Sequence, residues 1–290
     1  MPIVLDRRSF LKHAAGSVTL AAAAARLRAD VSIARLALLS DTHIAADKND
    51  TYRGFSPYAN LTTVVDQVGR ERFDLAVVNG DLARLTGETA DYTQFASLMK
   101  PIVDKTPTLL TMGNHDGREH AQAALVSHRG TLQPVAKKWV TTIDAGPVSL
   151  VFLDSLLATN VTPGQLGKAQ RNWLASYLDA NASKTLVVFV HHQPDPENDG
   201  ALVDAEALLA ILRPRRAVKA LFFGHTHEYR REQQDGLHLV NLPAVGYNFS
   251  DPYPVGWVDA TFSPRIVTLK LHAIAGERRE DGKVAELSWR

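Results

Sequence analysis

The stretch LLTMGNHD, residues 109–116, is an apolar run that ends in an amide, an imidazole and a carboxylate. Alone, it also fits an ordinary turn followed by a helix cap, because Asn, Asp and Gly are common in both. Four other apolar runs end in a similar way: LALLSDTH (36–43), LAVVNGD (75–81), LVVFVHH (186–192) and ALFFGHTH (220–227). Ligands of α/β proteins bind at the carboxyl ends of strands, so we expect these five ends to converge on one site.

Short apolar runs alternate with longer amphipathic runs from Ile33 onward, which is the pattern of an α/β fold. The expected strands cover residues 34–40, 75–79, 108–112, 148–153, 185–190, 217–223, 237–242 and 265–272. The expected helices cover residues 60–72, 88–100, 118–128, 165–180 and 204–212. Because no linker or short repeat interrupts the alternation, residues 30–290 are predicted to form one domain.

The composition narrows the classes of function. Thirty-two Lys and Arg residues against 31 Asp and Glu residues give a formal net charge of +1, which argues against binding of extended nucleic acid. The chain has no cysteine, which excludes disulfides and thiolate metal sites. Any metal would therefore be held by His, Asp, Glu or Asn, and 11 histidines are present.

Residues 1–29 differ from the rest of the chain. The pair Arg7 and Arg8 precedes a weakly hydrophobic, alanine-rich run over residues 14–25, which resembles a twin-arginine export signal. That run is too short for an ordinary membrane-spanning helix, and an amphipathic N-terminal helix is the alternative. The pattern predicts export by the twin-arginine machinery to the periplasm or the outside of the cell, and a mature protein that is not embedded in a membrane.

Each polar strand end is a weak signal by itself. Gly80-Asp81 is a common turn pair, and His191-His192 could be satisfied by backbone hydrogen bonds. The pair His225 and His227 is a better metal signal, because alternate residues of an extended segment point to the same side. The ordered series of all five ends predicts a metal site, since burying so many polar groups without a partner would be costly.

These motifs resemble those of the calcineurin-like metallophosphoesterases, over residues 36–227. Within that superfamily SDTH, GNHD, VFLDS and HHQP look most like the bacterial branch of cyclic-nucleotide and glycerophosphodiester phosphodiesterases. The resemblance implies a four-layer α/β/β/α sandwich of two mixed sheets flanked by helices. Gln193 stands where relatives often carry proline, which affects the expected loop shape but no expected ligand.

The resemblance also implies a dinuclear centre of two transition metal ions, drawn from Fe, Mn, Zn and Co. A metal-bridging hydroxide would then attack the phosphoester, because paired ions lower the pKa of water and neutralise charge in the transition state. Asp81 is expected to bridge the two ions. The other expected ligands divide into two sets, Asp41, His43 and His227 on one ion and Asn114, His191 and His225 on the other.

Three residues beside the ligands receive supporting roles. The resemblance assigns His115 to the departing oxygen, as a proton donor or a hydrogen-bond donor. Asp116 is expected to cap the helix that begins near Arg118 in preference to orienting His115. His192 could hydrogen-bond a ligand carboxylate or the phosphate, and a structural role is an equal alternative.

The sequence signals for a substrate pocket are weaker than those for the metal site. The long segment after His43 contains Tyr52 and Arg53, which could stack on a base and pair with a phosphate, or pack within their own loop. Tyr247 and Asn248 are candidates for another wall.

Hydrolysis of a small phosphodiester is the leading functional hypothesis. A phosphomonoesterase on the same site is the alternative within the enzyme class. A non-catalytic phosphate- or metal-binding protein is the alternative outside it. The oligomeric state does not follow from the sequence.

Overall fold

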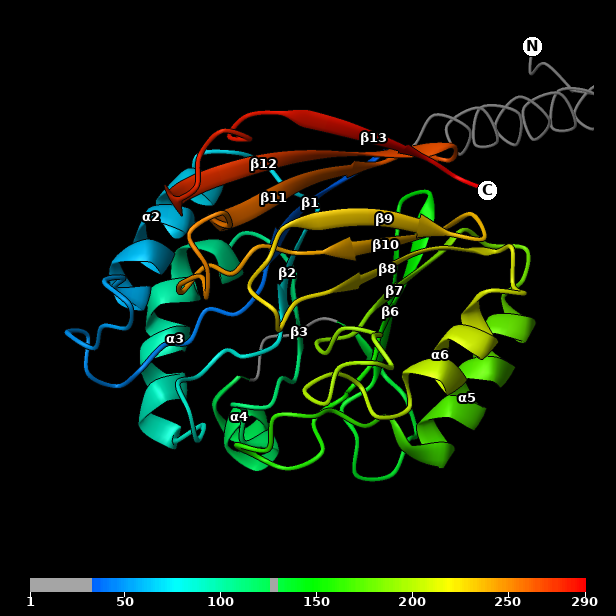
Figure 1. The fold of residues 1–290 in the computed structure, drawn as a ribbon, viewed down its shortest axis with the longest axis horizontal. Coiled ribbons are helices and arrows are strands. Elements are labelled where there is room, and N and C mark those ends of the chain that lie inside the picture. Colours follow the sequence, from blue (N-terminus) through cyan, green and yellow to red (C-terminus); the bar gives the residue numbers. More distant parts are fainter. Residues whose placement is uncertain (1–32, 126–129) are drawn as a thin grey trace, which may run out of the picture.

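Two β-sheets face one another in the computed structural model, which describes residues 33–125 and 130–290. Helices cover the outer face of each sheet, so the chain forms the expected four layers (Figure 1). This confirms the predicted fold class. The predicted export signal lies outside the described residues.

The first sheet has six strands in the order β13-β12-β11-β1-β2-β3. Its strands β1, β2 and β3 are parallel to one another, whereas β11, β12 and β13 join by antiparallel pairing. The bounds of these strands are β1 Ala34–Leu39, β2 Leu75–Asn79, β3 Thr108–Thr111, β11 Pro254–Phe262, β12 Ile266–Gly276 and β13 Val284–Ser288.

The second sheet has seven strands in the order β4-β5-β6-β7-β8-β10-β9. Strands β6, β7, β8 and β10 are parallel, and antiparallel strands close both edges. The bounds are β4 Thr131–Leu132, β5 Thr141–Ala145, β6 Val148–Phe152, β7 Leu186–Phe189, β8 Val218–Phe223, β9 Arg230–Gln234 and β10 Leu237–Asn241.

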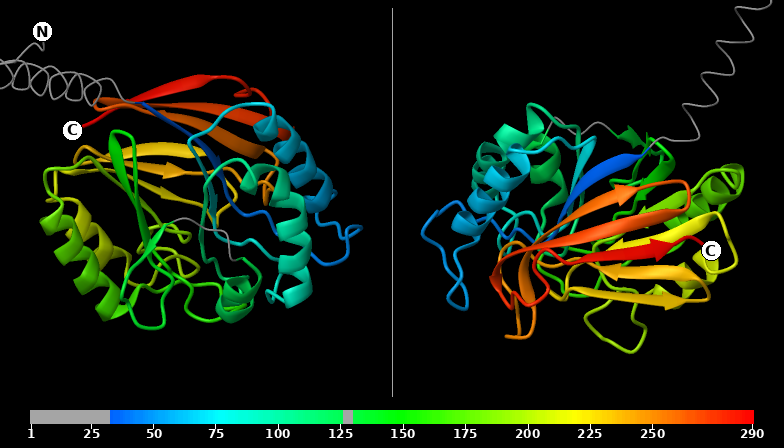
Figure 2. Two further views of the ribbon diagram at one scale, coloured as in Figure 1. Left: turned by 180° about the vertical axis from the view of Figure 1, so that it is seen from behind. Right: turned by 90° about the horizontal axis from the view of Figure 1, so that it is seen from above.

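Two groups of helices cover the outer faces. Figure 2 shows one group against the first sheet and the other against the second sheet, seen from behind and from above. The first group is α2 Pro57–Gly69, α3 Thr89–Val103 and α4 Arg118–Ala124, and the second is α5 Gly167–Ala180 and α6 Ala205–Leu212.

The core between the sheets explains why the central strands are continuously apolar. Phe152, Phe189 and Phe222 come from the adjacent strands β6, β7 and β8, and their rings stack at centroid distances of 4.9 and 5.0 Å. They pack in the same buried cluster as Leu36 and Leu38 of the first sheet. Strands buried on both faces have no room for polar side chains along their length, so the polar residues stand at their ends.

The predicted strands up to residue 242 agree closely with the structure, and the last one extends further, to Gly276. Strands β4, β5, β9, β11 and β13 were not predicted. Helix α2 begins earlier than predicted, because the Ser56 hydroxyl accepts a hydrogen bond from the Ala59 amide at 3.3 Å and a proline follows Ser56 directly. Helix α4 ends at Ala124, short of the predicted residue 128.

Candidate metal centre

The five polar loops converge although their strands belong to different sheets. Strands β1, β2 and β3 lie in the first sheet, and β7 and β8 lie in the second. Side-chain and backbone hydrogen bonds join the ends of the two sheets. Asn79 Nδ2 at the end of β2 donates to the Val190 carbonyl after β7 at 3.0 Å, and Asn79 Oδ1 accepts from the Thr111 hydroxyl of β3. The site therefore lies where the carboxyl ends of both sheets meet.

Most of the predicted ligands lie on an unusual backbone. A positive φ angle is uncommon for residues other than glycine, and it costs free energy that the surrounding structure must offset. Strained positions of this kind are concentrated at functional sites. Five of the seven predicted ligands have a positive φ: Asp41 (52°), His43 (47°), Asp81 (48°), His225 (69°) and His227 (56°).

Two glycines make room for the ligand side chains. A Cβ atom at Gly113 would collide with the Asp81 carboxylate, and a Cβ atom at Gly224 would collide with Ser40 and the Asp41 carboxylate. Each glycine immediately precedes a predicted ligand. The Gly-Asn and Gly-His pairs of the motifs are therefore required by close packing around the carboxylates.

Asp41, His43 and His227 form one half of the cluster, and all three are buried. His43 Nε2 lies 3.0 Å from His227 Nε2, and His227 Nε2 lies 3.4 Å from Asp41 Oδ1. The Asp41 carboxylate also accepts the backbone N–H of His225 at 3.1 Å, which fixes its position.

Asp81 lies between this half and the histidines after β7 and β8. Its Oδ2 is 3.7 Å from His43 Nε2 and 3.4 Å from His191 Nε2. Its Oδ1 accepts the backbone N–H of His115 at 2.8 Å. One carboxylate thus faces both halves of the cluster.

Backbone carbonyls orient three of the predicted histidine ligands. His191 Nδ1 donates to the Asn79 carbonyl at 2.9 Å, and His225 Nε2 donates to the Gly200 carbonyl at 3.0 Å. His227 Nδ1 donates to the Tyr247 carbonyl. Because a carbonyl can only accept, the second nitrogen of each ring keeps its lone pair for a metal ion.

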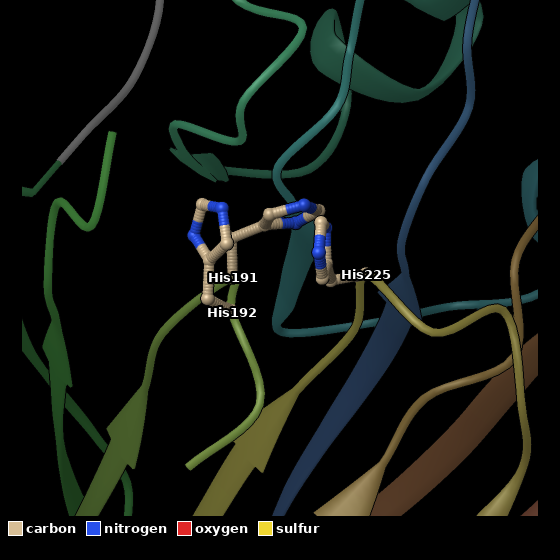
Figure 3. Close-up of side chains that lie close together, drawn as sticks. All are labelled: His191, His192 and His225. Carbon is tan, nitrogen blue, oxygen red and sulfur yellow. The ribbon is translucent and has the colours of Figure 1, made fainter. Parts of the chain in front are cut away.

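Several buried polar atoms in the second half have no hydrogen-bond partner among the described residues. They are Asn114 Oδ1, His191 Nε2 and His225 Nδ1. Unpaired buried polar atoms are rare and call for an explanation, and a bound ion supplies one. Figure 3 shows His191 and His225, with His192 beside them, in the loops that follow β7 and β8.

The electrostatics of the cluster suit cation binding. Burial raises the pKa of Asp41, but His191 and His227 outweigh it and hold the pKa at about 2. Burial lowers the pKa of His225 to about 4, so this ring is neutral at pH 7. Burial also disfavours the charged form of His191, yet Asp81 and Asp41 raise its pKa to about 10. The two buried carboxylates therefore attract a positive charge, which is a proton when no metal is bound.

The donor set consists of imidazole nitrogens and carboxylate or amide oxygens, and it fits first-row transition metals. The described residues contain four overlapping groups of His and Asp side chains that could each hold an ion. The structure thus brings six of the seven predicted ligands to one place, and the seventh, Asn114, directly follows Gly113, whose backbone lies against the Asp81 carboxylate.

His115 stands at the edge of this cluster and is partly exposed. Its Nδ1 donates to the Leu85 carbonyl at 2.9 Å, and its ring lies 5.3 Å from the ring of His43. Nε2 of the ring has no hydrogen-bond partner among the described residues. This geometry suits a group that contacts a substrate.

The predicted role of Asp116 as a helix cap is wrong. The N-cap position of α4 is Gly117, and no side chain caps the helix. The fully buried Asp116 carboxylate instead accepts hydrogen bonds from Gly113 N at 2.9 Å, Leu82 N at 3.1 Å and the Tyr92 hydroxyl at 3.0 Å. Burial and the charge of Asp81 raise the pKa of Asp116 to about 6. Asp116 therefore ties the loop that carries Asp81 to the loop that carries Asn114.

Of the two roles expected for His192, the structural role agrees with its hydrogen bonds. Its Nε2 donates to the Thr162 carbonyl at 3.0 Å, and its Nδ1 accepts from the Ser155 hydroxyl at 2.8 Å. Although His192 lies near His191 and His225, both of its ring nitrogens are engaged, so it is not free to bind an ion. The adjacent Gln193 is buried and leaves His191 within the cluster.

Tyr52 and Arg53, the predicted substrate residues of the long loop, differ in their contacts. The ring of Tyr52 packs on that of Tyr247 at 4.7 Å, and the Arg84 guanidinium lies over Tyr52 at 5.0 Å. Arg53 is exposed and has a positive φ of 54°. The ring of Tyr52 thus packs on Tyr247 and Arg84, both outside its own loop, and the binding of substrate by Tyr52 and Arg53 stays a prediction.

Tyr247, predicted as part of a pocket wall, contacts the cluster, and so does a neighbouring residue that the sequence did not indicate. Tyr247 stacks on His43 at 4.7 Å, and Phe249 stacks on His227 at 4.2 Å. Asn248 instead fixes the loop by donating to the Tyr253 carbonyl. Phe249 and Arg84 carry no recognisable motif, so only the folded structure identifies them.

A cluster of His, Asp and Asn at the strand ends of a two-sheet sandwich defines a class, the metal-dependent phosphoric ester hydrolases. The comparison with family models gives the same result. Residues 34–229 match the model described as calcineurin-like phosphoesterase, and the chain belongs to that family. The predicted enzyme class is confirmed.

The chain is similar over most of its length to two cyclic nucleotide phosphodiesterases. The chain is 30% identical over 222 residues to the 3′,5′-cyclic adenosine monophosphate phosphodiesterase CpdA of Pseudomonas aeruginosa, covering 74% of this chain and 77% of that protein. It is 26% identical over 246 residues to CpdA of Escherichia coli strain K12, covering 82% of this chain and 86% of that protein.

Solved structures support the fold. A dimetal phosphatase from Danio rerio superposes with a TM-score of 0.71 at 17% identity, covering 88% of this chain and 99% of that chain. A purple acid phosphatase from yellow lupin superposes with a TM-score of 0.63, also at 17% identity, covering 90% of this chain and 54% of that chain. Across residues 33–125 and 130–290, no helix has the length and apolar character needed to cross a membrane.

Replacing Asp116 by asparagine tests its role in joining the loops. Asp116→Asn would turn an NH₂ group towards backbone donors, so we expect the free energy of unfolding to fall by about 2 kcal/mol. Chemical denaturation measures the change, with the exposed Asp199→Asn as the matched control. Equal stability of the two variants would contradict the role.

Proposed function

We propose that this chain hydrolyses a small phosphodiester at a dinuclear metal centre. The position of Asp81 carries the proposal, because its Oδ2 lies 3.7 Å from His43 Nε2 and 3.4 Å from His191 Nε2. A single carboxylate therefore faces two separate sets of donors. The first set is Asp41, His43 and His227, and the second is Asn114, His191 and His225.

Two bound ions would supply Lewis-acid stabilisation of the phosphoryl oxygens and would lower the pKa of water towards neutrality. The uneven charge of the donor sets supports a division of labour. Asp41 contributes a negative charge to the first set, whereas Asn114 contributes a neutral oxygen to the second. The second set therefore compensates less positive charge and is the better place for a substrate oxygen. Fe, Mn, Zn and Co all suit these donors.

His115 is proposed to act on the leaving group. The Leu85 carbonyl accepts from its Nδ1, which holds the ring in place. In the protonated, imidazolium form of the ring, Nε2 would donate its proton to the departing oxygen of the substrate. Its backbone N–H is bonded to Asp81, so the ring is held at a fixed position relative to the shared carboxylate.

The rim of the site supports a diester over a monoester. A phosphomonoester carries more negative charge than a phosphodiester and is favoured by a positively charged surface. The second ester group of a diester is uncharged and is favoured by an uncharged surface. Leu85 and Phe249 are each 47% exposed at this rim. The nearby Arg84 is paired with Asp50 at 3.2 Å and is not free to bind a second phosphate charge. The CpdA relatives, named as phosphodiesterases, agree with this preference.

A comparison of two chromogenic substrates tests the proposal. We expect the metal-loaded protein to hydrolyse bis(p-nitrophenyl) phosphate with a higher kcat/KM than p-nitrophenyl phosphate. The reverse order would identify a phosphomonoesterase. Binding of metal without turnover of either substrate would identify a non-catalytic protein.

Two variants separate metal binding from proton donation. Asp81→Asn and His115→Ala should each lower turnover of a cyclic nucleotide, whose leaving group is an alkoxide, by about 100-fold or more. Only Asp81→Asn should also deplete bound metal, as measured by elemental analysis. His115→Ala should affect p-nitrophenolate release less, because that leaving group needs little protonation. An equal loss with both leaving groups would argue against proton donation by His115.

The proposal also includes export of the protein from the cytosol. The Arg7-Arg8 pair and the alanine-rich run support transport of residues 30–290, as the phosphoesterase domain, by the twin-arginine machinery. This pathway carries folded proteins, and the substrate would then be a phosphodiester outside the cytosol. Replacing both arginines by lysine should retain the protein in the cytosolic fraction. Unchanged export of that variant would contradict this part of the proposal.

A further inference from the structure

Phe249 is an exposed aromatic residue in contact with the metal cluster. Its ring stacks on that of His227, with centroids 4.2 Å apart and planes inclined by 25°. Nevertheless 47% of the residue remains exposed. One part of the ring is thus covered by a predicted ligand, and the rest faces solvent.

A row of rings connects Phe249 to His115. The ring centroid of His43 lies 5.3 Å from that of His115 and 5.0 Å from that of His227, and Phe249 stacks on His227. His115 and Phe249 are therefore the first and last members of this series of ring contacts, which runs through His43 and His227. If the leaving oxygen lies at His115, the ester group that stays on the phosphorus extends towards Phe249.

The surroundings hold Phe249 in a fixed orientation. Its ring meets the ring of Tyr247 edge-on at 5.7 Å, and Tyr247 is only 2% exposed and stacks on His43. The Asn248 side chain donates to the Tyr253 carbonyl, which closes the loop from Asn248 to Tyr253 beside Phe249. A ring held in this way loses little conformational entropy when a ligand stacks on it.

We infer that Phe249 is a stacking subsite for a planar ring on the retained ester group of the substrate. The inference rests on the proposed function and adds a specificity-determining residue, Phe249, which would favour phosphodiesters whose retained alcohol carries a nucleobase or a similar planar ring. Stacking on one phenyl face tolerates every base, because every base has a π-face. The subsite therefore selects for the presence of a ring and discriminates weakly among bases.

Two diesters with the same leaving group isolate this subsite. Thymidine 5′-(p-nitrophenyl phosphate) retains a nucleoside, whereas methyl p-nitrophenyl phosphate retains only a methyl group. Phe249→Ala should lower kcat/KM for the thymidine ester about tenfold, mainly through KM, since base stacking on aromatic residues contributes an effect of that size. The methyl ester should be hydrolysed at an unchanged rate.

Control variants and metal content complete the experiment. Phe249→Trp should retain the preference for the thymidine ester, and Leu132→Ala, an exposed apolar truncation on β4 at the edge of the second sheet, should change neither substrate. Equal losses for both esters would overturn the inference and assign Phe249 to support of His227. Unchanged kinetics with both esters would overturn it as well. Failure of the wild-type protein to hydrolyse either ester would instead refute the proposed function.

Discussion

The structure depends on one buried carboxylate that faces two groups of metal donors. Asp81 is 2% exposed, and its negative charge lies among imidazoles and beside the second buried carboxylate, that of Asp41. Burying such charges is costly unless a countercharge is present. Two cations would provide that countercharge, and the free lone pairs of His191 and His225 are oriented to receive them.

The rest of the fold provides the rigidity that this arrangement needs. Five predicted ligands lie on backbone of positive φ, and glycines must leave space for the carboxylates. Local strain of this kind persists only where the surrounding structure over-determines it. The apolar core between the sheets and the hydrogen bonds of Asn79 and Asp116 hold the strand ends in register. Packing and hydrogen bonds outside the site thus stabilise a backbone geometry that is unfavourable by itself.

The sequence predicted the central strands and the site because both leave local signals. An apolar run followed by Asp, His or Asn can be recognised without knowledge of the fold, as in residues 36–43 and 220–227. The contacts of Asp116 could not be predicted, because its partners Leu82 and Tyr92 are distant in sequence. Strand β9 was missed for a different reason, since its residues RREQQ have no apolar alternation at the edge of the sheet. Phe249 likewise shows no signal until folding stacks it on His227.

Anomalous diffraction from crystals of the Mn-loaded protein would locate the bound ions. We expect two anomalous peaks about 3.5–4 Å apart, the spacing typical of two-metal sites, with the Asp81 carboxylate between them. One peak should contact Asp41, His43 and His227, and the other should contact Asn114, His191 and His225. A single peak, or two peaks that do not share Asp81, would rule out a dinuclear centre bridged by Asp81.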